Sequence, residues 1–149
     1  MADAYLSEDF PLNLGGSGSS GGSAMDLLSD TLKLQLHTST HTPSQGMGVR
    51  ADLDNEVATG NGYTTGGATL SGKTYAVSSL VTTFDAADVS WTNLTKTHRY
   101  AWLYDDTPAT PLDPLIGYVD SGGDQENTDT TLNYQWNAAG IFTFTVAGP

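Results

Sequence analysis

Few residues of this chain have the type and spacing that chemistry requires. His37 and His41 stand four residues apart, the separation that places two zinc ligands on one face of a helix. They fall instead at the end of an expected strand and in a Thr- and Pro-containing loop, and the third histidine, His98, is distant in sequence. Because zinc sites need at least three protein ligands, we interpret both as surface histidines and expect no metal.

Acidic residues offer two further kinds of site. The run from Asp120 to Asp129 has oxygens for calcium, but it lacks EF-hand spacing and we interpret it as an acidic turn. Asp105 with Asp106, or Asp85 with Asp88, could serve as the two acids of a glycosidase. Neighbouring strand residues point to opposite faces and aspartate favours turns, so these carboxyl groups are expected to cap turns.

No other pattern predicts an enzyme. No glycine pattern frames a serine as a nucleophile elbow, and no segment matches a phosphate-binding P-loop. The aromatic residues indicate binding instead: Trp91, Trp102 and Trp136, with the tyrosines, could stack on sugars or anchor a protein interface. Core packing is the interpretation that we favour for each, because alternating aromatic strands fill sandwich interiors. We therefore expect no catalytic residue and no cofactor.

Short strands must position these residues. One segment, 30–38, alternates strictly and places Leu32, Leu34 and Leu36 on a buried face. In the segment 98–104, Tyr100, Trp102 and Tyr104 share one face while the residues between them face the other way, so both faces are expected to be covered. The remaining strands are expected at 73–77, 80–84, 89–91, 115–120, 130–136 and 141–146. The pattern predicts a single all-β domain, a β-sandwich, with a Greek-key or barrel-like arrangement as the alternative.

Three connections have recognisable turn chemistry. Residues 137–140 (NAAG) are expected to join the last two strands as a tight hairpin. The glycine-rich run 60–67 predicts a structured loop held by Tyr63, because glycine supplies positive φ at no steric cost. Residues 50–57 are expected to form one or two helical turns.

Composition limits the partners. The chain has 149 residues, no cysteine, 5 Lys and Arg, and 17 Asp and Glu, which gives a net charge of −12. No basic residue follows Arg99, and nucleic-acid binding requires Lys and Arg at the phosphates, so we expect no nucleic-acid partner. No stretch reaches the ~20 apolar residues of a membrane span, and the N-terminus has no signal-peptide pattern, so we expect no membrane partner.

The chain divides into three parts. Residues 1–14 are interpreted as an N-terminal arm, residues 15–23 (GGSGSSGGS) as a flexible hinge or an added expression linker, and residues 24–149 as the β-sandwich module. The arm is expected to be disordered in the free protein and to fold on a partner, because side-chain burial and ordering entropy nearly cancel. Five apolar residues of the arm are the candidate interface with a capsid or another subunit: Tyr5, Leu6, Phe10, Leu12 and Leu14.

Several segments, in order and spacing, resemble a widespread family of small structural proteins of tailed bacteriophages. They are 36–43, 56–67 (EVATGNGYTTGG), 81–91 (VTTFDAADVSW), 99–106 (RYAWLYDD), 114–120 (PLIGYVD) and 134–141 (YQWNAAGI). The resemblance covers about residues 32–146 and omits the arm and hinge. It implies a virion protein with a head-associated or decoration role. We expect the protein to be made in the host cytoplasm and, because packaged DNA would repel a net charge of −12, to bind the major capsid protein on the capsid exterior.

That resemblance implies a head decoration or minor capsid protein, assembled as a homo-oligomer with a trimer as the favoured state. Two alternatives stay open: a carbohydrate-binding module displayed on the virion, and a tail or neck component. A cleft lined by exposed Trp or Tyr with nearby carboxylates would favour sugar binding. An arm ordered only against another chain would favour the capsid role.

Overall fold

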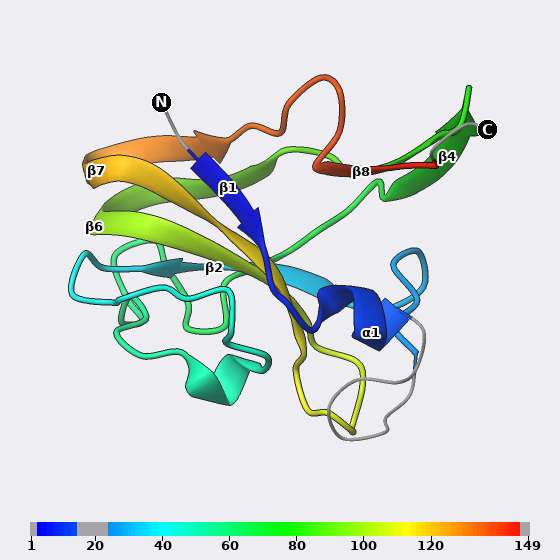
Figure 1. Cartoon of the computed structure of the whole chain (residues 1–149). Helices are drawn as coiled ribbons and strands as arrows, with labels where there is room; N and C mark the ends of the chain where they lie inside the picture. The colour runs from blue at the N-terminus through cyan, green and yellow to red at the C-terminus, as the bar shows by residue number, and fades with distance from the viewer. Residues whose placement is uncertain (1–2, 15–23, 147–149) are drawn as a thin grey trace.

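Two antiparallel sheets form the described chain, which comprises residues 3–14 and 24–146 of a computed structural model (Figure 1). The larger sheet contains, in spatial order, β1 (Asp3–Leu6), β7 (Leu115–Tyr134), β6 (Val89–Asp105), β2 (Leu32–His37) and β3 (Ala68–Thr69). The smaller sheet contains β4 (Thr74–Ser78), β5 (Val81–Asp85) and β8 (Phe142–Thr145). Two short helical segments are α1 (Phe10–Leu14) and η1 (Arg50–Asp52). The predicted all-β, sandwich-like single domain is confirmed.

The longest feature is the antiparallel pair of β6 and β7, with 17 and 20 residues. Its register runs from Tyr104 opposite Leu115 to Val89 opposite Tyr134. The sequence predicts separate strands at 89–91, 98–104, 115–120 and 130–136, whereas the structure joins them into two. The polar residues between them stay extended because each strand supplies main-chain hydrogen-bond partners to the other.

The prediction of an acidic turn from Asp120 to Asp129 is wrong, because these residues lie within β7. Tyr100 of β6 stands opposite Asp120, and His98 stands opposite Gln125. Four residues of β7, 121–124, therefore face one residue of β6 and form a bulge. The glycines that indicated a turn are accommodated in this bulge.

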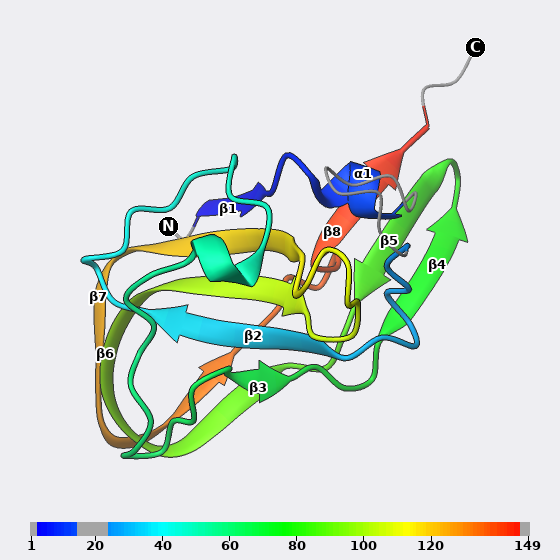
Figure 2. The same cartoon turned by 90° about the horizontal axis from the view of Figure 1, so that it is seen from below.

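Both faces of the last part of β6 are buried, as predicted. Ala101 and Leu103 belong to the main core, whereas Trp102 and Tyr104 pack with Leu115 in a second cluster on the other face. The main core is apolar and draws on both sheets and α1; its fully buried members include Phe10, Leu32, Leu36, Phe84 and Leu94. In Figures 1 and 2 the smaller sheet lies toward one end of the larger sheet.

The buried leucine face of β2 is confirmed, but its other face is not solvent-exposed as the alternation suggested. The three leucines are buried: Leu32, Leu34 and Leu36. Gln35 and His37, on the opposite face, are equally buried. Residues 49–56 cover that face, since Arg50 Nε donates to Gln35 Oε1 at 2.9 Å and His37 Nδ1 lies 2.6 Å from the carbonyl oxygen of Asp54.

Residues 137–140 do not form the expected hairpin. β7 stays paired with β6, while β8 pairs with β5 in the other sheet, with Phe84 opposite Phe142. A turn is present, because the Gly140 N–H donates to the carbonyl oxygen of Asn137 at 2.8 Å and Gly140 has φ +99°. A Cβ at position 140 would lie 2.8 Å from the carbonyl oxygen of Phe84, so glycine permits this close approach. The segment carries the chain from one sheet to the other.

The loop held by Tyr63 is confirmed. The Tyr63 side chain is buried, its hydroxyl donates to Glu56 Oε1 at 2.9 Å, and it accepts from the Leu36 N–H at 3.0 Å. Gly67 has φ +76°, and a Cβ there would lie 1.9 Å from the carbonyl oxygen of Leu34. Of the helical turns expected at 50–57, the structure contains the short 3-10 segment η1.

Candidate functional site

The N-terminal segment, residues 3–14, is part of the sandwich and not a separate arm. β1 pairs with β7, from Asp3 opposite Asp120 to Leu6 opposite Gly117. The Tyr5 ring stacks on Tyr118 at a centroid distance of 5.0 Å. The prediction of disorder in the free protein is therefore wrong for these residues. It weighed side-chain burial against entropy and left out the main-chain pairing that β7 of the same chain provides.

Phe10 cannot serve as the predicted capsid contact. Its side chain is fully buried, with ring centroids 5.1 Å from Phe142 and 6.2 Å from Phe144. Leu6 and Leu14 are half-buried, and Tyr5 and Leu12 are exposed. Of the five candidate interface residues, Tyr5 and Leu12 are thus the ones that present apolar surface to solvent. The predicted hinge, 15–23, lies outside the described residues.

A cleft of about 650 Å³ opens between the larger sheet and the segment that leads from β7 to β8. Four of its apolar lining residues are nearly fully buried: Leu34, Ala101, Leu103 and Ile116. Its less buried residues include the aromatics Tyr134 and Trp136 and the amides Gln125, Asn133 and Asn137. Ala4, Tyr5 and Leu6 of β1 also line it. The N-terminal segment therefore helps to build this cleft.

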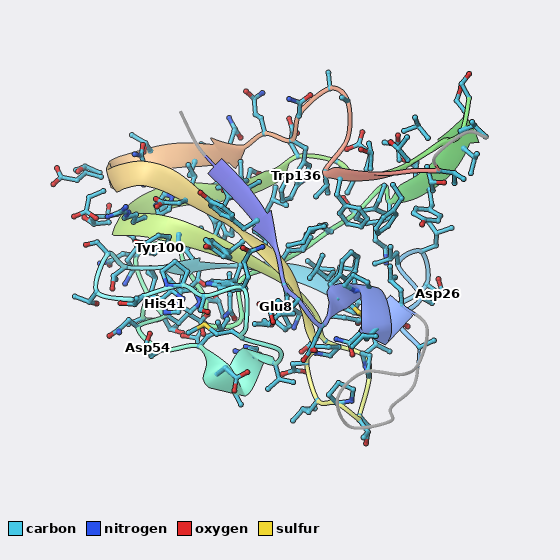
Figure 3. All side chains as sticks on the ribbon, viewed as in Figure 1. Glu8, Asp26, His41, Asp54, Tyr100 and Trp136 are labelled. Atoms are coloured by element: carbon cyan, nitrogen blue, oxygen red, sulfur yellow. The ribbon has the colours of Figure 1, made fainter. Side chains whose placement is uncertain are left out.

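Tyr134 and Trp136 are held in place. Their rings make an edge-to-face contact at a centroid distance of 5.5 Å. Trp136 Nε1 donates to the carbonyl oxygen of Ala87 at 3.2 Å, and the Trp136 N–H donates to Asp88 Oδ1 at 3.1 Å. Figure 3 labels Trp136 where the chain passes from β7 toward β8. A fixed aromatic face beside amide groups can bind an uncharged ligand that has both apolar and hydroxyl surface.

His98 contributes a neutral imidazole to the cleft wall. Its side chain is buried, and burial lowers its pKa to about 4. At neutral pH the ring therefore has one nitrogen that donates a hydrogen bond and one that accepts. Among the described residues that line the cleft there is no Asp or Glu. The sequence singled out Trp136 as a possible stacking residue, but it gave no signal that His98 would lie in the same cleft.

His37 and His41 are buried, so the prediction of surface histidines is wrong. The Gln35 amide nitrogen lies 2.8 Å from His37 Nε2, which leaves His37 Nδ1 to donate to the Asp54 carbonyl oxygen. Trp102 Nε1 donates to His41 Nε2 at 2.9 Å, and His41 Nδ1 lies 2.5 Å from Asp54 Oδ1 (Figure 3). All four ring nitrogens thus have protein partners and do not offer a lone pair to a metal.

The paired carboxyl groups contact the main chain or a cation. Asp105 is fully buried, its Oδ1 accepts from the Thr107 N–H at 3.0 Å, and burial raises its pKa to about 7. Asp106 points elsewhere, with Oδ2 at 2.6 Å from Lys33 Nζ. Asp85 Oδ1 accepts from the N–H of Ala86. Asp105 and Asp106 thus have separate partners, as expected. The expected local turn contact is present for Asp105 and Asp85, whereas Asp106 pairs with Lys33 and Asp88 accepts from the N–H of Trp136.

The acidic part of β7 forms an ion pair. The Arg99 guanidinium donates to both Asp120 oxygens, at 2.9 and 3.0 Å, and holds the pKa of that carboxyl below its usual value. In the described ranges, no group of three or more His, Cys, Asp or Glu is placed to hold a metal ion. No helix in this part of the chain is both long and apolar enough to span a membrane.

No protein-family model matches the chain, and neither a curated protein nor a solved structure is significantly similar to it.

Proposed function

We propose that this chain is a structural protein of a tailed-bacteriophage virion, a head decoration or minor capsid protein bound to the outer capsid surface. The observation that carries the proposal is the position of the residues that bear the resemblance. Phe84, Trp102 and Tyr63 are buried in the two clusters or the loop that define the fold. Gly117 and Gly67 stand where a side chain would collide with a neighbouring strand. The likeness thus falls on residues that determine the structure, which supports a shared fold and, by analogy, a shared role.

The net charge of the chain supports a position on the outer surface of the capsid. A chain with net charge −12 is repelled by packaged DNA, whose phosphates carry one charge per ~1.7 Å of duplex. The same charge keeps the protein soluble before assembly. An antibody against the chain should therefore label intact, DNA-filled particles of the virus that encodes it. Labelling that appears only after the particles are opened would contradict an exterior position.

Attachment to the capsid is assigned to the free end of the smaller sheet. Leu80 and Val146 are both exposed there, and the Val146 N–H donates to the carbonyl oxygen of Leu80 at 2.9 Å. Figure 1 shows this end of β4, β5 and β8 pointing away from the larger sheet. These two adjacent aliphatic side chains are available to pack against a partner surface.

Co-sedimentation with purified capsids tests this assignment. A double variant, Leu80→Asn with Val146→Thr, should remain folded, because Asn tolerates the positive φ of 68° at position 80. We expect it to lose retention on capsids relative to the unmodified chain. A matched variant, Tyr5→Ser with Leu12→Ser, tests the N-terminal segment instead. If neither variant loses retention, the apolar residues of both regions are not the attachment surface.

A carbohydrate-binding role is the second candidate, and the cleft favours it. Tyr134 and Trp136 supply the fixed aromatic surface on which a sugar ring packs, and the amides supply hydrogen bonds to hydroxyl groups. The carboxylates expected beside such a platform are not among the lining residues, so the pattern is met in part. Titration of the purified chain with host cell-wall oligosaccharides, followed by tryptophan fluorescence, tests this role. Trp136→Ala should abolish any change; saturable binding by the unmodified chain would favour this candidate over the purely structural one.

A further inference from the structure

The outer edge of β4 is open. β4 pairs with β5 on one side, and Figure 2 shows no described element beyond its other side. All five of its residues are exposed. From position 74 to 83 the sequence (TYAVSSLVTT) has no charged residue and no proline. Proteins generally protect an edge strand with lysine, proline or a bulge, because its unpaired main chain is a template for another strand. β4 has none of these features.

The turn that follows β4 fixes which main-chain groups face outward. Ser79 and Leu80, with φ +50° and +68°, form a two-residue connection, and Ser78 stands opposite Val81. In such a hairpin the pair that flanks the turn is hydrogen-bonded, and the direction of bonding alternates along the strand. Ser78, Ala76 and Thr74 therefore bond toward β5. Tyr75 and Val77 direct their N–H and C=O groups to the open edge.

The side chains of the same two residues extend the apolar core to that edge. Phe142 stacks on Phe84 at 5.1 Å, and Phe84 contacts Tyr75 at 6.4 Å between ring centroids. This row of aromatic side chains ends at Tyr75, which is 42% exposed, and Val77, on the same face, is 73% exposed. At β4, the core-facing side of the smaller sheet is therefore left exposed to solvent.

We propose that β4 pairs in antiparallel fashion with β4 of a second copy, around a two-fold axis at Ala76, so that two small sheets become one. In this register Tyr75 of each copy stands opposite Val77 of the other, and these are the residues whose main-chain groups face outward. The pairing completes both hydrogen-bonded pairs and forms two aromatic to β-branched contacts, which are favourable cross-strand pairs. Ala76 stands opposite Ala76 in the closely spaced, non-hydrogen-bonded position between them.

A second copy fits this edge better than an unrelated partner. A two-fold interface must be self-complementary, and the register centred on Ala76 meets that condition while it pairs all five residues of β4. Two chains of net charge −12 repel each other, and an uncharged strand is where they can approach at least electrostatic cost. The contact joins copies in pairs, so it differs from the trimer expected from the sequence and can link neighbouring oligomers. It does not depend on the virion role.

Cysteine cross-linking tests the register directly, because the natural chain has no cysteine. Opposed residues in a non-hydrogen-bonded pair have Cα atoms about 4.5 Å apart, within disulfide range. Ala76→Cys should therefore form a covalent dimer under mild oxidation. Thr74→Cys, on the same exposed strand, is the control. Its two cysteines would lie four positions apart along the paired strands, roughly 14 Å, so this variant should remain monomeric. Equal dimerisation of both variants, or none of Ala76→Cys, overturns the proposal.

A main-chain variant provides the second readout. Val77→Pro removes an outward N–H while leaving the bonds to β5, and proline is tolerated at an open edge. Val77→Thr keeps that N–H and is the matched control. In sedimentation equilibrium at equal concentration, Val77→Pro should dimerise at least tenfold more weakly than Val77→Thr, with circular dichroism unchanged. Dimerisation of Val77→Thr should strengthen with added salt, which screens the repulsion between copies. Equal association of the two variants contradicts pairing through β4.

Discussion

β2 and β4 are short strands of similar length with opposite surroundings. β2 (LKLQLH) contains Lys33, Gln35 and His37, yet it lies between β6 and β3 and is almost completely buried. β4 (TYAVS) has stronger strand-forming residues and no charge, yet all of it is exposed at a sheet edge. Position in the sheet, and not the hydrophobicity of the strand itself, decides which strand stabilises the fold and which remains free to bind.

The largest expected effect compares the same substitution in both strands. Leu34→Asp places an unpaired carboxylate in the core and should destabilise the fold by more than about 4 kcal/mol, a large share of a typical domain's stability. Val77→Asp, at the exposed edge, should change stability by about 0.5 kcal/mol or less. Chemical denaturation followed by circular dichroism measures both values. Both values refer to dilute, monomeric protein, and similar losses in the two variants would show that β4 is covered within its own chain.

The second prediction concerns the N-terminal edge of the larger sheet, which unlike β4 is secured by a buried side chain. Phe10→Ala leaves a cavity beside Phe142 and Phe144 and should destabilise the protein by ~3–5 kcal/mol. Leu12→Ala, on the exposed side of α1, should cost far less. Thermal melting of the two variants gives the comparison. Equal melting temperatures would mean that the segment does not pack on its own chain.

Deletion of residues 1–23 extends the same test. The arm interpretation expects a folded, unaffected module after this deletion. The structure instead predicts a lower melting temperature, because the deletion removes β1 and Phe10 from the sandwich. It also removes the wall of the cleft formed by Tyr5 and Leu6. An unchanged melting temperature would support a detached arm.

Strand positions could be predicted from the sequence, whereas strand partners could not. Alternation and turn residues located β2, β4 and β5 and the ends of β6 and β7. They did not show that residues 121–129 continue β7, because the signal for extension there comes from pairing with β6 and not from the residues themselves. For the same reason, the turn at 137–140 looked like a hairpin although it joins two sheets.

The candidate site was less predictable than the fold. The burial of His41 depends on Trp102, which is far away in sequence, and on Asp54, which lies in an irregular segment. The same segment covers His37. The cleft combines β1, β6, β7 and the crossing segment, so no local pattern could reveal it. The sequence named Trp136 as a possible stacking residue together with Trp91 and Trp102, and it could not distinguish Trp136 from these two, which are buried.

The third prediction tests how β1 is held at its edge. Gly117 stands opposite Leu6, and a Cβ there would lie 2.4 Å from the carbonyl oxygen of Tyr5. Gly117→Ala should therefore push β1 away from β7 and cost about 1–3 kcal/mol. Gly123→Ala, in the bulge of β7, meets no atom within 4 Å and is the control. Hydrogen exchange should show faster exchange of the β1 amides in the first variant alone; protected β1 amides in both would contradict the close approach.

The smallest expected effect is a pH dependence at the buried end of β2, where Leu32 stands opposite Asp105. Burial raises the pKa of Asp105 from 3.8 to about 7, so the folded state binds more protons than the unfolded state between these values. The contribution of Asp105 to stability is therefore complete below about pH 4 and is lost as the pH rises to about 7. His37 has the opposite effect. Burial lowers its pKa from 6.5 to about 4, so its contribution to stability is lost as the pH falls through this range. Asp105→Asn removes the first dependence and keeps the second. The difference in melting temperature between this variant and the unmodified chain should be small at pH 4, grow in favour of the variant up to pH 7, and stay constant above; a difference that does not vary with pH would show that Asp105 is ionised in the folded protein throughout this range.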